Sequence, residues 1–191
     1  MDKALKSKVL PFVLAIVVIV LDQITKMLVV RFIPIPEGGF MGFGASFLGD
    51  FFQIIHVRNT GVAFSFGADW PEFIRKLLFS VFTFIVLVLV IVAYMRTNEF
   101  TKLQRWTIMG IVGGGFGNLI DRVFRPAGVV DFLDVKWFGI TGSKIKLLRM
   151  ERWPTFNVAD AAVVVCGIIL AVSFICSLVA ESKQAKKNKS K

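Results

Sequence analysis

Four long stretches of the sequence are almost continuously apolar, and most polar residues gather between them or at their ends. The stretches cover residues 9–30, 73–94, 103–124 and 156–180, each close to the roughly 20 residues that a helix needs to cross a bilayer. Because backbone groups inside a bilayer must be hydrogen-bonded within their own segment, each stretch is predicted to be a helix. The pattern predicts a mainly α-helical integral membrane protein with four transmembrane helices in one domain, residues 1–182.

The second and fourth stretches are uncharged over most of their length, whereas the first and third carry polar residues. Asp22 and Lys26 in the first stretch lie four residues apart, which allows them to pair on one face of a helix. The third stretch has glycines at 113–115 and 117, followed by Asn118. Such glycines favour close packing against another helix, and an amide this late in a membrane helix needs a buried partner.

The loop between the first and second stretches contains a β-rich segment. Residues 51–58 are rich in strand-forming side chains, residues 59–61 are typical of a turn, and residues 62–66 return as a second strand. A glycine- and phenylalanine-rich segment, residues 38–47, comes before them and is expected to rest in the membrane interface. The pattern predicts a small β-rich extracytoplasmic subdomain between helices 1 and 2.

Composition and charge exclude a soluble enzyme and favour a membrane setting. The chain is 55% hydrophobic and 19% charged, with a mean hydropathy of +0.72 and a net charge of +10. Lysines flank the first and last apolar stretches, so anionic phospholipid headgroups are better expected partners than nucleic acid. Four crossings put both termini on one side, and the density of Lys and Arg favours the cytoplasm. Residues 183–191 are predicted to be a disordered basic cytoplasmic tail, and the role of the basic loop 136–153 stays open.

The chain offers few residues for metal or thiol chemistry. His56 is the single histidine, and Cys166 and Cys176 lie ten residues apart in one apolar stretch. On one helix that spacing separates them by roughly 15 Å, too far for a disulfide. We therefore expect no metal site and no cofactor, and any chemistry must use carboxylates, amides or hydroxyls.

Topology brings several of these polar groups to one level of the membrane. If the third helix exits outward and the fourth re-enters, Asp131 and Asp160 lie on the same face. Two aspartates a few Å apart cannot both ionise easily, and such a pair can activate water to cleave an amide. The spacing alone does not prove that they meet. Asp160 can also be an acid favoured by the start of a helix, and Asp131 an ordinary loop acid.

Five ordered motifs resemble the bacterial lipoprotein signal peptidase family, signal peptidase II. They are Asp22-Gln23-Ile24-Thr25-Lys26, Asn59-Thr60-Gly61-Val62-Ala63-Phe64, residues 113–122 ending in Asn118-Leu119-Ile120-Asp121-Arg122, Val129-Val130-Asp131-Phe132 and Phe156-Asn157-Val158-Ala159-Asp160-Ala161. The resemblance covers nearly the whole chain. Any one motif alone is weak, but five in the expected topological places are specific.

The resemblance implies an aspartic endopeptidase of the bacterial cytoplasmic (inner) membrane, with its active site towards the outer face. Such enzymes remove signal peptides from prolipoproteins by cutting before a diacylglyceryl-modified cysteine, and globomycin-type inhibitors occupy their catalytic dyad. Asp131 and Asp160 match the catalytic positions. The substrate-binding or dyad-supporting positions are matched by Asp22, Asn59, Asn118, Arg122 and Asn157.

Other interpretations compete with this one. A transporter would spread its acids across the depth of the bilayer, whereas these crowd into the outer half. A noncatalytic membrane assembly factor would use the same acids only as structure. Asp121 is expected to form a structural ion pair with Arg122 and is left out of the site, and Asp134 is expected to be solvated. The Arg122 side chain can also simply reach the headgroups.

Overall fold

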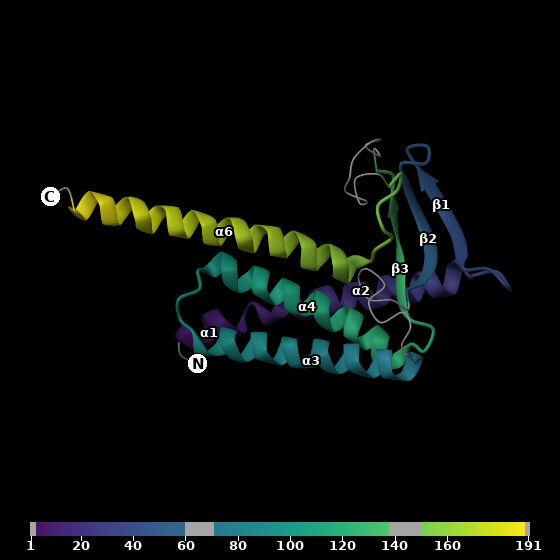
Figure 1. The fold of residues 1–191 in the computed structure, drawn as a ribbon, viewed down its shortest axis with the longest axis horizontal. Coiled ribbons are helices and arrows are strands. Elements are labelled where there is room, and N and C mark those ends of the chain that lie inside the picture. Colours follow the sequence, from purple (N-terminus) through teal and green to yellow (C-terminus); the bar gives the residue numbers. More distant parts are fainter. Residues whose placement is uncertain (1–2, 60–70, 138–149, 190–191) are drawn as a thin grey trace.

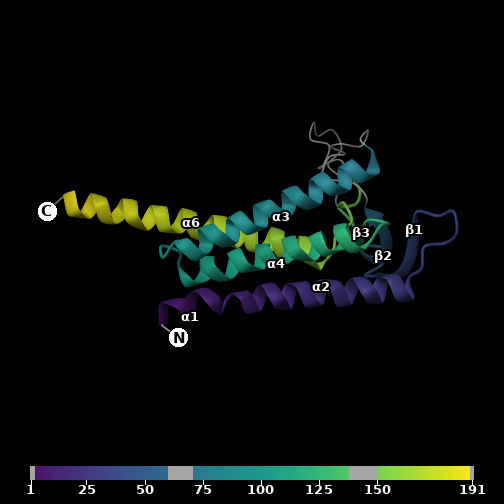
Figure 2. The ribbon, with the colours of Figure 1, turned by 90° about the horizontal axis from the view of Figure 1, so that it is seen from below.

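The fold is a bundle of helices with a small sheet at one end. A computed structural model describes residues 3–59, 71–137 and 150–189 (Figure 1). The helices are α1 (Lys3–Val9), α2 (Phe12–Phe32), α3 (Glu72–Arg96), α4 (Lys102–Phe124) and α6 (Val158–Lys189). Both ends of the chain lie at the end of the bundle opposite the sheet (Figures 1 and 2).

The helix bounds agree with the apolar stretches except at the two ends of the chain. The first stretch is divided, because α1 ends at Val9 and α2 begins after Pro11, whose ring cannot continue a helix interior. The prediction of a disordered tail after residue 182 is wrong for the described residues, since α6 continues to Lys189. Lysine, glutamine and alanine are strong helix formers and extend the helix beyond its apolar part.

Three of the described helices are long and apolar enough to cross a membrane. These candidate spans are Leu5–Phe32, Leu77–Arg96 and Val158–Gln184. The third predicted span, α4, is not among them, because it contacts α2, α3 and α6 and carries buried polar side chains. Its polar residues therefore meet other parts of the protein instead of lipid.

The glycines of α4 allow the other helices to approach closely, as their pattern predicts. A Cβ on Gly113 would lie 2.8 Å from the Cα of Ala15 in α2, and one on Gly115 would lie 2.6 Å from a leucine of α3. A Cβ on Gly114 would collide with the carbonyl oxygen of Ala159 in α6. Because each neighbour occupies the space of a side chain, these glycines are packing positions. Both cysteines are free, as their spacing predicts.

The described sheet has three antiparallel strands, in the order β1 (Met41–Phe47), β2 (Phe52–Asn59) and β3 (Val129–Val135). The predicted β-rich segment is thus confirmed as β2, but its partners differ from those expected. The glycine- and phenylalanine-rich segment supplies β1, since Gly49 with a φ of 72° permits a tight turn back into β2. The expected return strand, residues 62–66, lies outside the described residues.

The third strand shows that the sheet is not built only from the loop between helices 1 and 2. β3 comes from the loop between α4 and α6, and a register shift in β2 between Ile54 and Val57 brings Val57 opposite Asp131. His56 lies in β2, as predicted, within this irregular part. β3 also binds the chain before α6, because the N–H groups of Phe132 and Leu133 both donate to the Phe156 carbonyl. This contact holds the start of α6 beside Asp131.

Candidate functional site

Asp131 lies in β3 with a side chain that is almost completely buried. One carboxylate oxygen accepts a hydrogen bond from Asn59 Nδ2 at 2.9 Å, and the other accepts one from Asn157 Nδ2 at 2.7 Å. Burial is the largest influence and raises the pKa of Asp131 to about 6, and the nearby charge of Asp160 acts in the same direction. The two asparagine hydrogen bonds oppose this shift. The Asp131 carboxyl can therefore hold a proton well above the usual range for an aspartate.

Asp160 is in the first turn of α6 and is half-buried. Its Oδ2 accepts a hydrogen bond from the backbone N–H of Asn157 at 3.2 Å, while its own backbone N–H donates to Asn157 Oδ1 at 3.0 Å. This reciprocal pair caps the helix. Asn118 Nδ2 donates to the second carboxylate oxygen of Asp160 at 2.7 Å. Capping therefore accounts for one oxygen of Asp160, and an amide from another helix binds the other.

Asn157 links the two acids. It is fully buried, and its backbone N–H binds Asp160 while its side-chain amide binds Asp131. The same Nδ2 group lies 3.0 Å from Asn118 Oδ1. Both predicted catalytic acids thus contact one residue, and three asparagines surround them with neutral donors.

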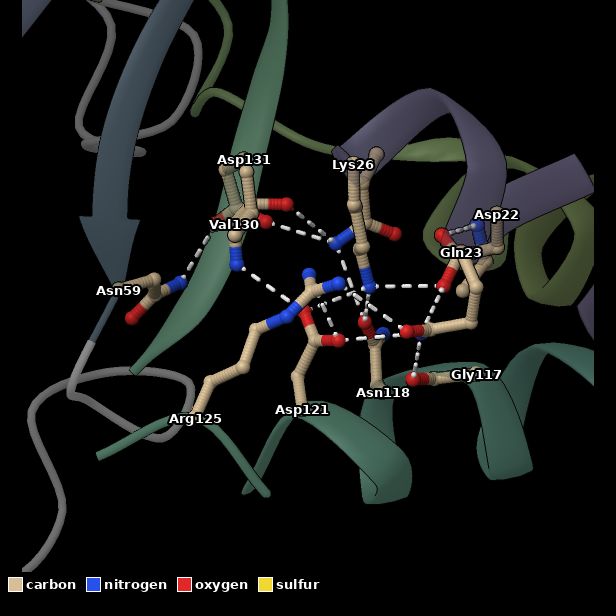
Figure 3. A network of polar contacts seen from close by, with 12 residues as sticks. Asp22, Gln23, Lys26, Asn59, Gly117, Asn118, Asp121, Arg125, Val130 and Asp131 are labelled. Atoms are coloured by element: carbon tan, nitrogen blue, oxygen red, sulfur yellow. Dashed lines mark hydrogen bonds and ion pairs between the residues drawn. The ribbon is translucent and has the colours of Figure 1, made fainter. Parts of the chain in front are cut away.

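A second group of acids lies beside the first and is bound by a cation. Lys26 Nζ is 2.8 Å from Asp22 Oδ2 and 3.0 Å from Asp121 Oδ2, and it donates to Asn118 Oδ1 at 2.9 Å (Figure 3). The Lys26, Asp22 and Asp121 side chains are all inaccessible to solvent. The predicted pairing of Asp22 with Lys26 is confirmed, and the partner that Asn118 needs is present.

Asp22 also connects α2 to the start of α6. Its Oδ1 accepts the backbone N–H of Ala159 at 3.0 Å, an otherwise unpaired donor in the first turn of that helix. Gly117 of α4 makes this approach possible, because a Cβ there would lie 2.7 Å from Asp22 Oδ2. Asp22 therefore supports the helix that carries Asp160, although no hydrogen bond joins it to either Asp131 or Asp160 in the described structure.

The expected pairing of Asp121 with Arg122 is wrong, since the Asp121 carboxylate pairs with Lys26 and Arg125 instead. Besides Lys26, its carboxylate pairs with Arg125 at 3.1 Å and accepts hydrogen bonds from the Val130 N–H at 3.1 Å and Gln23 Nε2 at 3.0 Å. Sequence reasoning left Lys26, Gln23 and Arg125 out of the site. The spacing of four residues between 121 and 125, like that between 22 and 26, was the available signal.

Two further predictions concern single charged residues near Asp131. Arg122 is half-buried and interacts electrostatically with Asp160, Asp131 and Asp121. Asp134 is buried instead of solvated, because Arg152 Nε donates to its carboxylate at 2.6 Å. The Asp134 carboxylate is thus paired with a cationic side chain, whereas that of Asp131 in the same strand is bound by asparagine amides.

Fold and site define a helical membrane protein whose polar centre contains carboxylates and amides. Among the described residues, no group of three or more His, Cys, Asp and Glu side chains is placed to hold a metal ion. The sequence model of the family described as signal peptidase (SPase) II matches residues 14–176. The chain belongs to the signal peptidase II family and is a peptidase.

Curated relatives and solved structures agree with this family. The chain is 48% identical to a lipoprotein signal peptidase of Treponema denticola over 93% of this chain and 95% of the relative. It is 45% identical to one from Treponema pallidum over 89% and 85% of the two chains. A solved structure described as a bacterial membrane enzyme has a similar fold, with a TM-score of 0.69, 23% identity and 88% of each chain covered.

Proposed function

We propose that this peptidase removes signal peptides from prolipoproteins and that Asp131 and Asp160 are its catalytic pair. The observation that carries the assignment is the environment of these two acids. Both bind Asn157 and neutral amides, whereas Asp22 and Asp121 are bound by Lys26. An acid held by neutral amides can take up a proton without leaving a buried cation unpaired.

The two acids take different roles at the scissile amide. Asp131, with a pKa of about 6, holds the proton and donates it to the carbonyl oxygen of the substrate. Asp160 lies at the positive end of α6 and takes a proton from water, whose oxygen attacks the carbonyl carbon. When the C–N bond of the tetrahedral intermediate breaks, Asp160 returns a proton to the leaving amine and Asp131 recovers its own.

Other polar residues position this pair. Asn59, Asn118 and Asn157 fix the carboxylates through the hydrogen bonds described above. Arg122 interacts electrostatically with the same acids, so its guanidinium is suited to stabilise negative charge or to bind the substrate backbone. Asp22 supports the pair indirectly by capping α6.

The proposed membrane placement has four crossings, with α4 as the third span, enclosed by the other helices, and residues 1–182 as one domain. Both termini face the cytoplasm of a bacterial cell, where the basic residues 183–191 form a tail. The sheet and the catalytic pair then lie towards the outer face of the cytoplasmic membrane. A prolipoprotein can approach laterally, keep its acyl chains in the bilayer and present the bond before its diacylglyceryl-modified cysteine. Globomycin-type inhibitors are expected to occupy the same pair.

The test is cleavage of a diacylglyceryl-modified prolipoprotein by the purified chain in lipid. Asp131→Asn and Asp160→Asn should each reduce kcat/KM by about 10⁴-fold while thermal unfolding shows a folded protein. Asp50→Asn is the matched control, because Asp50 is an exposed acid that pairs with Lys136. It should cleave normally, and a globomycin-type peptide should inhibit it. Full activity in either dyad variant would instead favour the noncatalytic assembly factor.

A further inference from the structure

A basic cavity lies at the end of the bundle opposite the catalytic pair. It has a volume of about 490 Å³ and is enclosed by α1, the break before α2 and the beginning of α4. Its lining includes the cationic residues Lys6, Lys102 and Arg105 and the apolar residues Leu10, Phe100 and Trp106. No acidic residue lines it among the described residues. The cavity therefore has a positive side and an apolar side.

Arg105 gives the cavity a charge that the described protein does not neutralise. Its side chain is buried with 6% exposed, Nε donates to the Phe100 carbonyl and Nη2 donates to the Asn98 carbonyl, each at 3.1 Å. The guanidinium also lies over the ring of Tyr94. All these partners are neutral, and Nη1 has no hydrogen-bond partner among the described residues. An anion nearby would offset the cost of burying this charge.

The start of α4 adds to the positive potential. Lys102 is the first residue of this helix, and Thr101 forms the cap before it. The N-terminus of a helix favours negative charge, and a phosphate group is a common ligand there. The exposed side chains of Lys6 and Lys102 are free to move towards such a group.

The apolar side of the cavity continues onto the surface of the bundle. Leu10, at the break before α2, is 56% exposed, and Leu103, beside Lys102, is 53% exposed. Trp106 is half-buried at the same level. Tryptophan and lysine are both characteristic of the boundary between the hydrocarbon and the headgroups. A ligand that combines an anion with apolar chains fits this surface better than a free anion does.

We propose that this cavity binds the phosphate of an anionic phospholipid, with Lys6 and Lys102 on the phosphate and the acyl chains along Leu10 and Trp106. Basic pockets between membrane helices on the cytoplasmic side are known sites for such headgroups. The bound lipid joins α1 to the beginning of α4. It therefore stabilises the end of the bundle that is remote from catalysis.

A second basic cavity, of about 590 Å³, lies near the other end of α2 and contains Arg31, Arg58 and Arg125. Its charge is partly neutralised already, because Arg125 pairs with Asp121. The cavity at Arg105 has no such acid and is the stronger lipid site. Arg31 lines this second cavity and not the cavity at Arg105, so an Arg31→Gln variant tests lipid binding at the second cavity alone.

The experiment measures lipid binding to the full chain in detergent by native mass spectrometry, with thermal unfolding as a second readout. Phosphatidylglycerol should bind and raise the unfolding temperature more than phosphatidylcholine with the same acyl chains. Lys6→Gln and Lys102→Gln should each weaken phosphatidylglycerol binding about fivefold. Lys183→Gln, which removes the same charge from an exposed position in α6, should leave binding unchanged.

Three results would overturn the proposal. Equal weakening by Lys183→Gln would indicate a response to overall charge, and weakening by Arg31→Gln alone would move the site to the other cavity. Equal protection by glycerol phosphate, which carries the headgroup phosphate without acyl chains, would identify a free phosphate as the ligand. None of these measurements involves cleavage, so their outcome is independent of the proposed catalytic pair.

Discussion

Two pairs of aspartates lie next to each other in this protein and have opposite surroundings. Asp22 and Asp121 share the ammonium group of Lys26, whereas Asp131 and Asp160 share Asn157. Asn118 belongs to both groups, since its oxygen accepts from Lys26 and its nitrogen donates to Asp160. The same type of side chain is thus bound by a cation on one side of the Asn118 amide and by neutral amides on the other.

The difference follows from the charge of the partners. A buried carboxylate next to a cation is stabilised in its ionised form, and removal of the cation leaves an expensive uncompensated charge. An asparagine amide fixes the position of a carboxylate but adds no net charge. Burial raises the pKa of Asp131 to about 6, which moves this carboxyl towards its protonated form. Proton transfer at Asp131 is therefore compatible with an intact fold.

The largest effect should come from breaking the cation-bound pair. Lys26→Met leaves the buried acids Asp22 and Asp121 without their shared cation, so we expect a loss of about 3–5 kcal/mol in the free energy of unfolding. The measurement is unfolding in detergent followed by circular dichroism. Lys183→Met removes the same charge from an exposed site and should change stability little. A Lys26→Met protein as stable as its parent would contradict the structural role of this pair.

A smaller effect, with a characteristic pH dependence, should come from Asp131→Asn. The pKa of Asp131 rises from 3.8 to about 6 on folding, so the unfolded chain ionises first as pH increases. The free energy of unfolding of the parent therefore falls by up to about 3 kcal/mol between pH 4 and pH 7, and none of this loss is present below pH 4. Asp131→Asn removes that loss, so the stability of the variant relative to the parent should increase as pH rises.

Asp50 is the control for this measurement because its pKa is shifted in the other direction. A hydrogen bond from Lys136 lowers the pKa of Asp50, so its stabilisation is present at neutral pH and is lost as pH falls through the lowered value. Asp50→Asn should therefore lose stability relative to the parent at neutral pH and converge with it in acid. The same trend in both variants would contradict the assigned pKa of Asp131.

The sequence predicts most of the helical architecture because long apolar stretches have few alternatives in a membrane. It also predicts the packing role of Gly113–Gly115, since glycines in such a helix serve close approach. It does not predict that β1 pairs with β2, because the pairing depends on a turn at Gly49 and on a register set by β3. Strand partners are tertiary choices, whereas a membrane helix is determined largely by its own residues.

The site shows the same division between local and tertiary information. Motif positions and topology predict that Asp131 and Asp160 approach each other, and both contact Asn157 in the structure. The separation into cation-bound and amide-bound acids is not visible in the sequence, where Asp121 stands beside Arg122. A helix places adjacent residues about 100° apart, so Asp121 turns towards Lys26 while Arg122 faces the other acids.

Gly117 of α4 lies so close to Asp22 that a larger side chain there should disturb the packing. Gly117→Ala introduces a Cβ only 2.7 Å from Asp22 Oδ2, so the cap on α6 or the contact with Lys26 must shift. We expect a loss of about 1–3 kcal/mol in the free energy of unfolding, together with reduced cleavage because Asp160 moves with α6. Gly167→Ala is the matched control, since no atom lies within 4 Å of its added Cβ. Equal stability of the two variants would show that Gly117 is not required for this approach.

The smallest expected effect tests the amide-bound pair directly. The hydrogen bond from Asn59 lowers the pKa of Asp131 against the effect of burial, so Asn59→Ala should raise that pKa above about 6. Since Asp131 must be protonated to act as the acid, the alkaline limb of the kcat/KM profile should move upward by about one pH unit or less. Asn98→Ala at the other end of the bundle should leave the limb in place, because Asn98 uses only its backbone carbonyl in the contact with Arg105. An unchanged or lowered limb in Asn59→Ala would mean that the observed proton belongs to another group, and the roles of Asp131 and Asp160 would then have to be exchanged.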